Sequence, residues 1–287
     1  MPIDYEKEYD NRGRVPEHPQ IFARWEREGA AYRAAARDGE FGLAYGAQPR
    51  QKIDIFPAKD DGDQTPLALF IHGGWWRSLE PSMFSQLAAG PNARGISVAV
   101  TGYELCPNCS IASIIEQMRN ACLWLWRRYR KRIFVYGHSA GGHLAACMLG
   151  QDWTAFASDA PADLVPAAYA ISGVFDLSPL LHVSQNADLR LDAAEARRVS
   201  PLFWTVPAGR SFDAVVGALE SNEFLRQSKS IVEDWGTRGV KTRYEEIAGA
   251  NHFTVVDPLA DPASAMTRRV VELAALTAAR QSLGHST

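Results

Sequence analysis

Seven short runs rich in β-forming residues recur from residue 50 onward, and helical patterns separate them. Several of these runs are apolar at every position, as expected of parallel strands that are buried on both faces of a sheet. Strands that alternate with helices predict an α/β fold with a mostly parallel, doubly wound sheet. The expected strands are residues 51–58, 67–73, 97–103, 132–137, 167–174, 212–219 and 242–248.

Helices are expected where apolar or small residues recur three and four positions apart. Residues 111–129 show this spacing, and Ser110 is a suitable N-cap for them. Residues 140–149 form a helix of small residues that can lie close to the strands, and Gly150 can end it. The last helix is expected to follow Asp261, with that residue as its N-cap.

The length of 287 residues lies near the upper limit for one hydrophobic core, so a single domain over 1–287 is expected. Residues 1–45 precede the sheet and contain a helical stretch, which we expect to pack across the domain as a cap. Residues 177–210 are irregular, and their prolines favour an excursion between two strands. Insertions of this kind often roof an active site, which is the role expected for this one.

Composition excludes several other classes of protein. Hydrophobic residues make up 46% of the chain and charged residues 22%, which is typical of a soluble globular enzyme. The net charge of −3 provides no basic surface for nucleic acid. The polar N-terminus does not resemble a signal peptide, and no apolar run approaches the roughly 18 residues of a membrane span. A cytoplasmic protein is expected, and a homodimer is expected only because symmetric pairs are the commonest oligomers.

Cys106 and Cys109 form a C-x-x-C pair, a spacing that also occurs in redox motifs and zinc sites. A zinc site would need a second pair, whereas Cys122 and Cys147 stand alone in helical patterns. A redox motif would need its own small βαβ unit. Reduced thiols in a loop are therefore expected.

The pentapeptide Gly-His-Ser-Ala-Gly at 137–141 fits the G-x-S-x-G pattern. An expected strand leads into it and an expected helix leads out of it, which is the context that a nucleophile elbow requires. The sharp turn strains the backbone of the serine and tolerates only small neighbours two residues away. This context favours Ser139 as a nucleophile over an ordinary hydroxyl in a glycine-rich turn.

The sequence Phe-Ile-His-Gly-Gly-Trp-Trp at 70–76 follows an expected buried strand. It matches the HGG-type loop whose N–H groups face the nucleophile elbow and bind an oxyanion. His72 is expected to hold this loop in shape rather than to transfer protons. The candidate oxyanion donors are the amides of Gly73, Gly74, Trp75 and Ala140.

A catalytic base is expected late in the chain, because this elbow goes with the order Ser, acid, His. His252 follows the last expected strand, whereas His182 lies in the irregular stretch and His285 in the C-terminal tail. His138 and His143 flank the serine but are expected to point away from its hydroxyl. His252 is therefore the predicted base.

The acid should follow the strand at 212–219, and Glu220 does. Asp213, Asp176 and Glu223 are the alternatives. Asp213 lies at the start of that strand, and Asp176 opens a segment that it can cap. Glu223 is in the first turn of the next helix, where a negative charge is favourable in any case. Glu220 is the predicted orienting acid because a triad needs a carboxylate at the C-terminal end of this strand.

The chain also resembles the α/β-hydrolases of the kynurenine formamidase (arylformamidase) type, which are related to hormone-sensitive-lipase-like esterases. The serine and histidine motifs are shared by many esterases, whereas the segments DLSPL and EFLRQS are more specific to this branch. The resemblance spans almost the whole chain. It is carried by EYDNRGRVPEHP (8–19), YGAQPRQKIDIFP (45–57), HGGWW (72–76), GHSAGGHLAA (137–146), SGVFDLSPLL (172–181), ESNEFLRQS (220–228) and GANHFTVVDPL (249–259).

The resemblance implies hydrolysis of the N-formyl group of an aromatic amine, with N-formyl-kynurenine as the leading substrate. The family usually has Asp at the position of Glu220, and this departure keeps Glu223 open as the acid. Trp76, Phe175 and Phe253 could stack on an aromatic substrate, although each could equally fill the core. A small-molecule substrate is expected, with no metal and no organic cofactor.

Three alternative functions remain open at this point. A carboxylesterase of short-chain or aryl esters, or an amidase of another aromatic N-acyl compound, would use the same apparatus. A hydrolase-fold scaffold that has lost catalysis is the third. It is disfavoured because Ser139, His252 and the glycine pair are all present.

Overall fold

The computed structural model describes residues 3–284, with side chains as far as residue 278. Its centre is a sheet with the strand order β1-β2-β4-β3-β5-β6-β7-β8. From β4 to β8 across the sheet, neighbouring strands are parallel, whereas β1 and β2 are antiparallel to their neighbours. The strands are β1 (Glu40–Ala44), β2 (Lys52–Phe56), β3 (Leu67–Ile71), β4 (Ser97–Thr101), β5 (Ile133–His138), β6 (Ala167–Ile171), β7 (Ser211–Gly217) and β8 (Lys241–Ile247).

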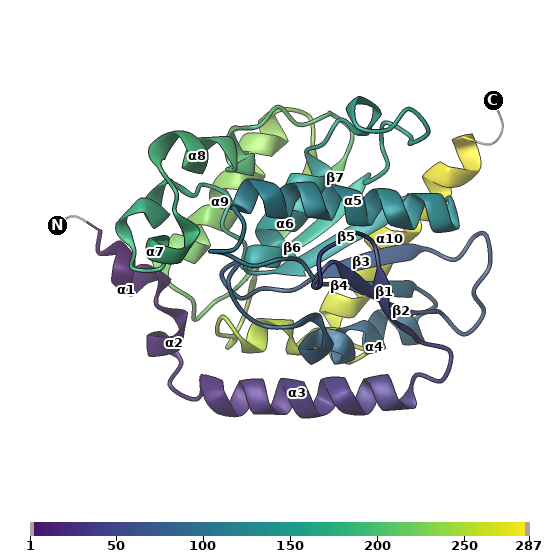
Figure 1. Ribbon diagram of the computed structural model, residues 1–287, viewed down its shortest axis with the longest axis horizontal. Helices are drawn as coiled ribbons and strands as arrows, with labels where there is room; N and C mark the ends of the chain where they lie inside the picture. Colours follow the sequence, from purple (N-terminus) through teal and green to yellow (C-terminus); the bar gives the residue numbers. More distant parts are fainter. Residues whose placement is uncertain (1–2, 285–287) are drawn as a thin grey trace.

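Helices cover both faces of this sheet, so that the molecule has three layers (Figure 1). Helices α5, α6 and α9 lie on one face, and α3, α4 and α10 lie on the other. The α-helices are α1 (Tyr5–Tyr9), α2 (Asn11–Arg14), α3 (His18–Ala35), α4 (Ala89–Ala93), α5 (Ile111–Tyr129), α6 (Ala140–Leu149), α7 (Asn186–Leu189), α8 (Ala193–Arg198), α9 (Asn222–Thr237) and α10 (Ala265–Gly284). Short 3₁₀ helices span Pro81–Ala88, Trp153–Ala155, Ser178–His182, Pro201–Phe203 and Thr254–Ala260.

The alternation of side chains along each central strand produces two separate cores. In β3, Leu67, Leu69 and Ile71 pack into the core beneath α5, α6 and α9, whereas Ala68 and Phe70 pack into the core on the α3 and α10 side. All five side chains are buried, which explains why this strand is apolar at every position.

The expected α/β fold is confirmed, and the seven expected strands all form. The helix at 111–129 has the expected bounds, and the Ser110 hydroxyl accepts a hydrogen bond from the Ser113 N–H at 3.2 Å. Strand β1 was not predicted. It is a largely exposed edge strand, so its residues lack the apolar pattern of the inner strands.

The predicted start of the last helix is wrong. Helix α10 begins at Ala265, and the hydroxyl of Ser264 accepts the N–H of Thr267 at 3.0 Å. Asp261 instead accepts the N–H of Ala263 at 2.8 Å, within the turn that precedes the helix. Both residues are good cap formers, and the sequence alone did not separate them.

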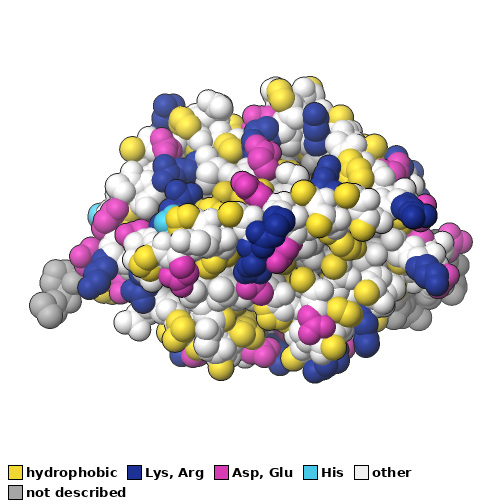
Figure 2. Space-filling model, turned by 90° about the horizontal axis from the view of Figure 1, so that it is seen from below, with side chains coloured by type: hydrophobic (Ala, Val, Ile, Leu, Met, Phe, Trp, Pro, Cys, Tyr) yellow, Lys and Arg dark blue, Asp and Glu magenta, His cyan; other side chains and the backbone are white. Residues whose placement is uncertain are grey.

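The N-terminal segment crosses the molecule as expected. In Figure 1, α1 and α2 lie beside the C-terminal ends of the parallel strands, and α3 extends along the lower face. On the face seen in Figure 2, acidic and basic side chains are interspersed among hydrophobic ones. No helix in residues 3–284 combines the length and the apolar character that a membrane crossing requires.

Candidate active site

The C-terminal ends of four parallel strands bring the chemistry-bearing residues together. Ser139 directly follows β5, and the glycine pair comes after β3. Glu220 follows β7, and His252 lies in the loop after β8. In open α/β sheets, ligands bind outside this edge of the strands.

Ser139 occupies the strained turn that its motif predicts. Its φ and ψ are 56° and −117°, a left-handed conformation that non-glycine residues rarely adopt. A Cβ on Gly141 would collide with the backbone oxygen of Ile71, so that position requires glycine. The tight approach of α6 to β3 therefore holds the serine at the strand end.

A chain of hydrogen bonds joins the three predicted triad residues. The Ser139 Oγ donates to His252 Nε2 at 3.1 Å, and His252 Nδ1 donates to Glu220 Oε2 at 2.6 Å. All three residues are buried. This arrangement suits a hydroxyl nucleophile with an imidazole base that a carboxylate orients.

The second oxygen of Glu220 is also fixed. Its Oε1 accepts hydrogen bonds from the Ser172 hydroxyl at 2.5 Å and from the Gly217 N–H at 2.7 Å. Sequence reasoning did not identify Ser172. It follows β6, next to β7, so the sheet order alone places it beside the acid.

The alternative acids are engaged elsewhere. Glu223 accepts hydrogen bonds from the Tyr9 hydroxyl at 3.1 Å and from the Arg226 guanidinium at 2.8 and 2.7 Å. Asp213 pairs with Arg269. Asp176 accepts the N–H of Ser178. Of the four carboxylates considered, Glu220 alone contacts His252 in the described residues.

The loop after β3 has a left-handed backbone. Gly74, Trp75 and Trp76 have φ values of 108°, 56° and 52°. The Gly74 carbonyl accepts hydrogen bonds from the amides of Arg77 and Ser78, each at 3.0 Å. Turns of this kind direct successive N–H groups toward one concave side, where an anion can bind.

This loop lies against the nucleophile. A Cβ on Gly73 would be 3.0 Å from the Cβ of Ser139. Gly74 and Trp75 line the cavity at Ser139, and neither N–H donates to another group within residues 3–284. Ala140 is the first residue of α6, immediately after the serine. The assignment of these four amides as the oxyanion hole stays a prediction.

Two buried histidines support this site. His72 Nδ1 bonds to the Gly73 carbonyl at 2.7 Å, and the Tyr103 hydroxyl donates to the His72 carbonyl at 2.9 Å. His138 Nε2 donates to the carbonyl of His252 at 2.7 Å. Burial lowers the pKa of His72 to about 4 and the pKa of His138 well below its usual range, so both rings are neutral.

His18, His143 and His182 form no hydrogen bond to the Ser139 hydroxyl in the described residues. His143 Nε2 bonds to the Val199 carbonyl at 2.7 Å, and burial lowers the pKa of His143 to about 4. His182 stacks on the ring of Tyr5. His285 lies outside the described residues.

A narrow cavity opens at Ser139 and His252, with a volume of about 30 Å³. Its walls are mostly aromatic or aliphatic, and the N-terminal segment contributes a third of the lining residues. The lining residues are Asn11, Arg12, Phe22, Trp25, Gly74, Trp75, Ser78, Leu79, His138, Ser139, His252 and Phe253.

Three predictions about the surroundings of the site need correction. Trp76 and Phe175 are completely buried and do not line the cavity, so they do not contact a substrate there. Trp76 packs edge-on against His143, and Phe175 packs against Phe212. Phe253 does line the cavity.

The third correction concerns the roof. Residues 177–210 contribute nothing to the cavity lining, and the roof comes from α2 and α3 instead. The Ser184 hydroxyl of this excursion donates to the Glu6 carboxylate of α1, so the N-terminal segment lies against the excursion. Both segments were expected to lie over the domain, and long-range packing decides which of the two faces the serine.

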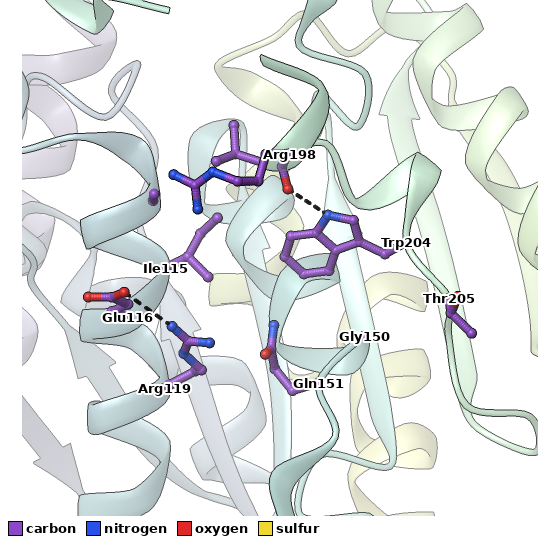
Figure 3. A pocket seen from close by; sticks show the side chains of 10 residues that line it. Ile115, Glu116, Arg119, Gly150, Gln151, Arg198, Trp204 and Thr205 are labelled. Atoms are coloured by element: carbon purple, nitrogen blue, oxygen red, sulfur yellow. Dashed lines mark hydrogen bonds and ion pairs between the residues drawn. The ribbon is translucent and has the colours of Figure 1, made fainter. Parts of the chain in front are cut away.

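A larger hollow of about 370 Å³ lies away from the triad, between α5, the end of α6 and the loop after α8 (Figure 3). Ile115 and Trp204 face it from opposite sides, with Arg119 and Gln151 below them in this view. Arg119 lies 3.6 Å from the carboxylate of Glu116. None of the predicted catalytic residues lines this hollow.

The cysteine pair shows no disulfide. Cys106, Cys109, Cys122 and Cys147 are all free thiols. Burial raises the pKa of Cys106 to about 12, so this thiol stays protonated at neutral pH.

Known proteins are similar to this chain in sequence. A family model described as BD-FAE matches residues 53–191. Kynurenine formamidase from Danio rerio is 27% identical over 241 residues, which cover 80% of both chains. The enzyme of the same name from Drosophila melanogaster is 29% identical over 238 residues, or 79% of this chain and 78% of that one.

Solved structures are also similar to this chain. A crystal structure from Silicibacter sp. TM1040, provisionally assigned as a thioesterase, is 31% identical with a TM-score of 0.81. The match covers 94% of this chain and 99% of that one. An esterase/lipase from an uncultured bacterium has a TM-score of 0.67 at 19% identity, covering 84% and 85% of the two chains. At that identity the second likeness shows the fold alone.

Proposed function

We propose that this chain, which belongs to the α/β-hydrolases of the kynurenine formamidase type, removes the formyl group from an aromatic N-formyl amine. That the protein is a hydrolase follows from its relatives and its fold. N-formyl-kynurenine is the proposed substrate, and kynurenine and formate are the products.

One observation carries this proposal. The hydrogen-bonded chain Ser139–His252–Glu220 opens on a cavity of only about 30 Å³ with aromatic walls. The space beside the serine is narrow, so a small acyl group fits there better than a bulky one. The formyl group is the smallest acyl group. The rings of Phe22 and Phe253, 5.2 Å apart, can pack against an aryl group beyond it.

The proposed mechanism begins with attack of the Ser139 Oγ on the formyl carbon. His252 Nε2 accepts the hydroxyl proton as the new C–O bond forms, and Glu220 stabilises the resulting imidazolium. The negative charge on the formyl oxygen would be bound by amides of the Gly73–Trp75 loop and of Ala140.

The intermediate then collapses with cleavage of the C–N bond. The imidazolium returns its proton to the departing aryl amine, which leaves as a neutral molecule. A water molecule, deprotonated by His252, attacks the formyl ester on Ser139. Formate leaves, and the serine regains its proton.

The test compares substrates of the same enzyme. We expect a kcat/KM for N-formyl-kynurenine near 10⁴ M⁻¹s⁻¹ or above, an ordinary value for an enzyme. It should exceed the value for p-nitrophenyl acetate, and Ser139→Ala should abolish both activities. Activity on p-nitrophenyl esters should also fall steeply from acetate to butyrate, because the acyl cavity is narrow. Ester hydrolysis with negligible deformylation would contradict the formamidase proposal and make the protein a short-chain esterase.

A further inference from the structure

The cavity at Ser139 has one permanently charged wall. Its lining residues include Arg12 but no Asp, Glu or Lys, and the two histidines among them lie at the serine end. The guanidinium of Arg12 lies over the ring of Phe22, 5.7 Å from its centroid. Arg12 is exposed, so solvent screens part of its charge, but it is the lining residue that is always positive and it favours an anionic group at this wall.

Arg12 has no acidic partner within the described part of the chain. Arg24 lies on α3, which also lines the cavity, and makes a bidentate pair with Asp257 at 2.9 and 2.7 Å. The guanidinium of Arg12 lies within ion-pair distance of no carboxylate in residues 3–284. Its donors are therefore available to a ligand.

The neighbouring residue offers a second donor. Asn11 also lines the cavity and is only 5% exposed, yet its Nδ2 has no hydrogen-bond partner in the described residues. A buried amide donor without a partner is unfavourable. A ligand oxygen in the adjoining cavity would supply the partner.

The segment that carries both residues is anchored on each side. Before it, the Tyr9 hydroxyl lies 3.1 Å from Glu223 Oε2 and 3.0 Å from Gln227 Nε2, both on α9. After it, Trp25 of α3 is completely buried beside Phe253. These contacts hold Asn11 and Arg12 at the cavity wall before any ligand arrives, which lowers the entropic cost of binding.

From this geometry we infer that Asn11 and Arg12 form a carboxylate subsite that selects acidic substrates for the triad. The inference rests on the proposed function, in which the substrate has an α-carboxylate at the end opposite its formylated amine. A guanidinium binds a carboxylate through paired hydrogen bonds, and the Asn11 amide would donate to one of the same oxygens. The subsite thus determines specificity at the leaving-amine side of the substrate.

The experiment measures the ratio of kcat/KM for an acidic substrate to that for its neutral counterpart. N-formyl-kynurenine is compared with N-formyl-kynuramine, which lacks only the carboxylate. For Arg12→Gln we expect the ratio to fall about tenfold to a hundredfold, mainly through KM, because a charge-assisted hydrogen bond is lost. For Arg12→Lys the ratio should lie between the wild-type value and the value for Arg12→Gln, since lysine keeps the charge but not the paired hydrogen bonds.

Arg14→Gln is the matched control. Arg14 lies on the same short helix, is exposed and does not line the cavity, so its removal should leave the ratio at the wild-type value. Thermal unfolding of each variant checks that the segment stays folded. An unchanged ratio in Arg12→Gln, or an equal fall in Arg12→Gln and Arg14→Gln, would overturn the inference.

A second substrate pair separates this inference from the proposed function. 3-Acetoxybenzoate and phenyl acetate differ in one carboxylate and require only ester hydrolysis. If the wild type cleaves these esters but does not deformylate N-formyl-kynurenine, the formamidase proposal fails. The ratio for the ester pair then decides the role of Arg12 by the same criterion.

Discussion

Two hollows in this molecule differ in size and in the residues that line them, and the smaller one contains Ser139 and His252. The hollow in Figure 3 has a volume of about 370 Å³, against about 30 Å³ for the cavity at Ser139. In the larger one, the Trp204 indole donates to the Arg198 carbonyl at 2.9 Å and the Gln151 amide donates to the Cys147 carbonyl at 2.8 Å. Its polar groups are thus largely satisfied by the protein itself.

The small cavity shows the opposite character. Ser139 has a left-handed backbone, and Asn11 Nδ2 and His138 Nδ1 have no hydrogen-bond partner in the described residues. Strain and unsatisfied polar groups are costly, and they persist where function requires them. The strained backbone of Ser139 and its hydrogen bond to His252, rather than volume, therefore distinguish this cavity.

The largest effect should come from the nucleophile. Ser139→Ala removes the attacking oxygen, and we expect kcat/KM for p-nitrophenyl acetate to fall about 10⁴- to 10⁶-fold. Within residues 3–284 the hydroxyl makes its side-chain hydrogen bond only to His252, so the unfolding midpoint in urea should change little. Retention of a tenth of the activity would show that the small cavity is not the catalytic one.

A somewhat smaller loss is expected at the acid. Glu220→Gln keeps the shape of the side chain but removes the negative charge that orients and stabilises the His252 ring. We expect kcat/KM to fall about 10³- to 10⁴-fold. Glu223→Gln is the control, because Glu223 bonds to Tyr9 and Arg226 and does not contact His252. A larger loss in the control would return the acid role to Glu223.

Buried histidines lie beside both hollows, and the free energy of unfolding should depend on pH because of them. His138 lines the small cavity, and His143 bonds to the carbonyl of Val199, which lines the large one. Burial lowers the pKa of His72 and His143 to about 4, below the value near 6.5 expected in the unfolded chain. Below pH 6.5 the unfolded state binds more protons, so stability is complete above that pH and is lost as the pH falls toward 4.

Each of these histidines should contribute a slope of up to about 1.4 kcal/mol per pH unit in that window. Urea unfolding at several values between pH 7 and 4 measures the slope. The variant His143→Gln should reduce the slope by up to about 1.4 kcal/mol per pH unit, which is the contribution of one proton. A slope that is the same in the variant and the wild type would refute the assignment of His143 as a buried neutral ring.

The smallest effect on catalysis is expected from the larger hollow. Trp204→Ala removes one of its walls, and we expect kcat/KM to stay within about twofold of the wild type. The free energy of unfolding should fall by about 1–2 kcal/mol, because a partly buried indole loses its packing. Steady-state kinetics and urea unfolding of the same preparation measure both quantities. A tenfold loss of activity would mean that the two hollows are functionally coupled.

Much of the site could be predicted because its chemistry depends on local sequence. The elbow at Ser139 needs a strand, small neighbours and a helix in direct succession, and all three are visible in 132–149. His252 could be placed because it follows the last strand of the sheet. Glu220 was favoured over Glu223 for the same reason, and the structure places Glu220 beside His252 while α9 carries Glu223 toward Tyr9.

The walls of the cavity could not be predicted in this way. Trp76 and Phe175 lie next to catalytic motifs in the sequence, yet both side chains point into the core. Adjacent residues on a strand or turn face opposite directions, so closeness in sequence does not place a side chain in the site. Asn11 and Arg12 lie far along the chain from the serine, acid and histidine motifs, and within the segment 8–19 nothing local distinguishes them from the other polar residues.

The sequence by itself determined the fold class and the succession of strands β2 to β8, and it predicted the nucleophile and base, because periodicity and turn chemistry act over a few neighbouring residues. Tertiary structure decided which segment covers the site. The irregular residues 177–210 and the partly helical N-terminal segment were both expected to lie over the domain, and the packing of Tyr9 and Trp25 against distant parts of the chain places the second over the site. That packing brings Arg12 to the cavity of Ser139, since burial of large aromatic side chains outweighs any local preference of the chain around them.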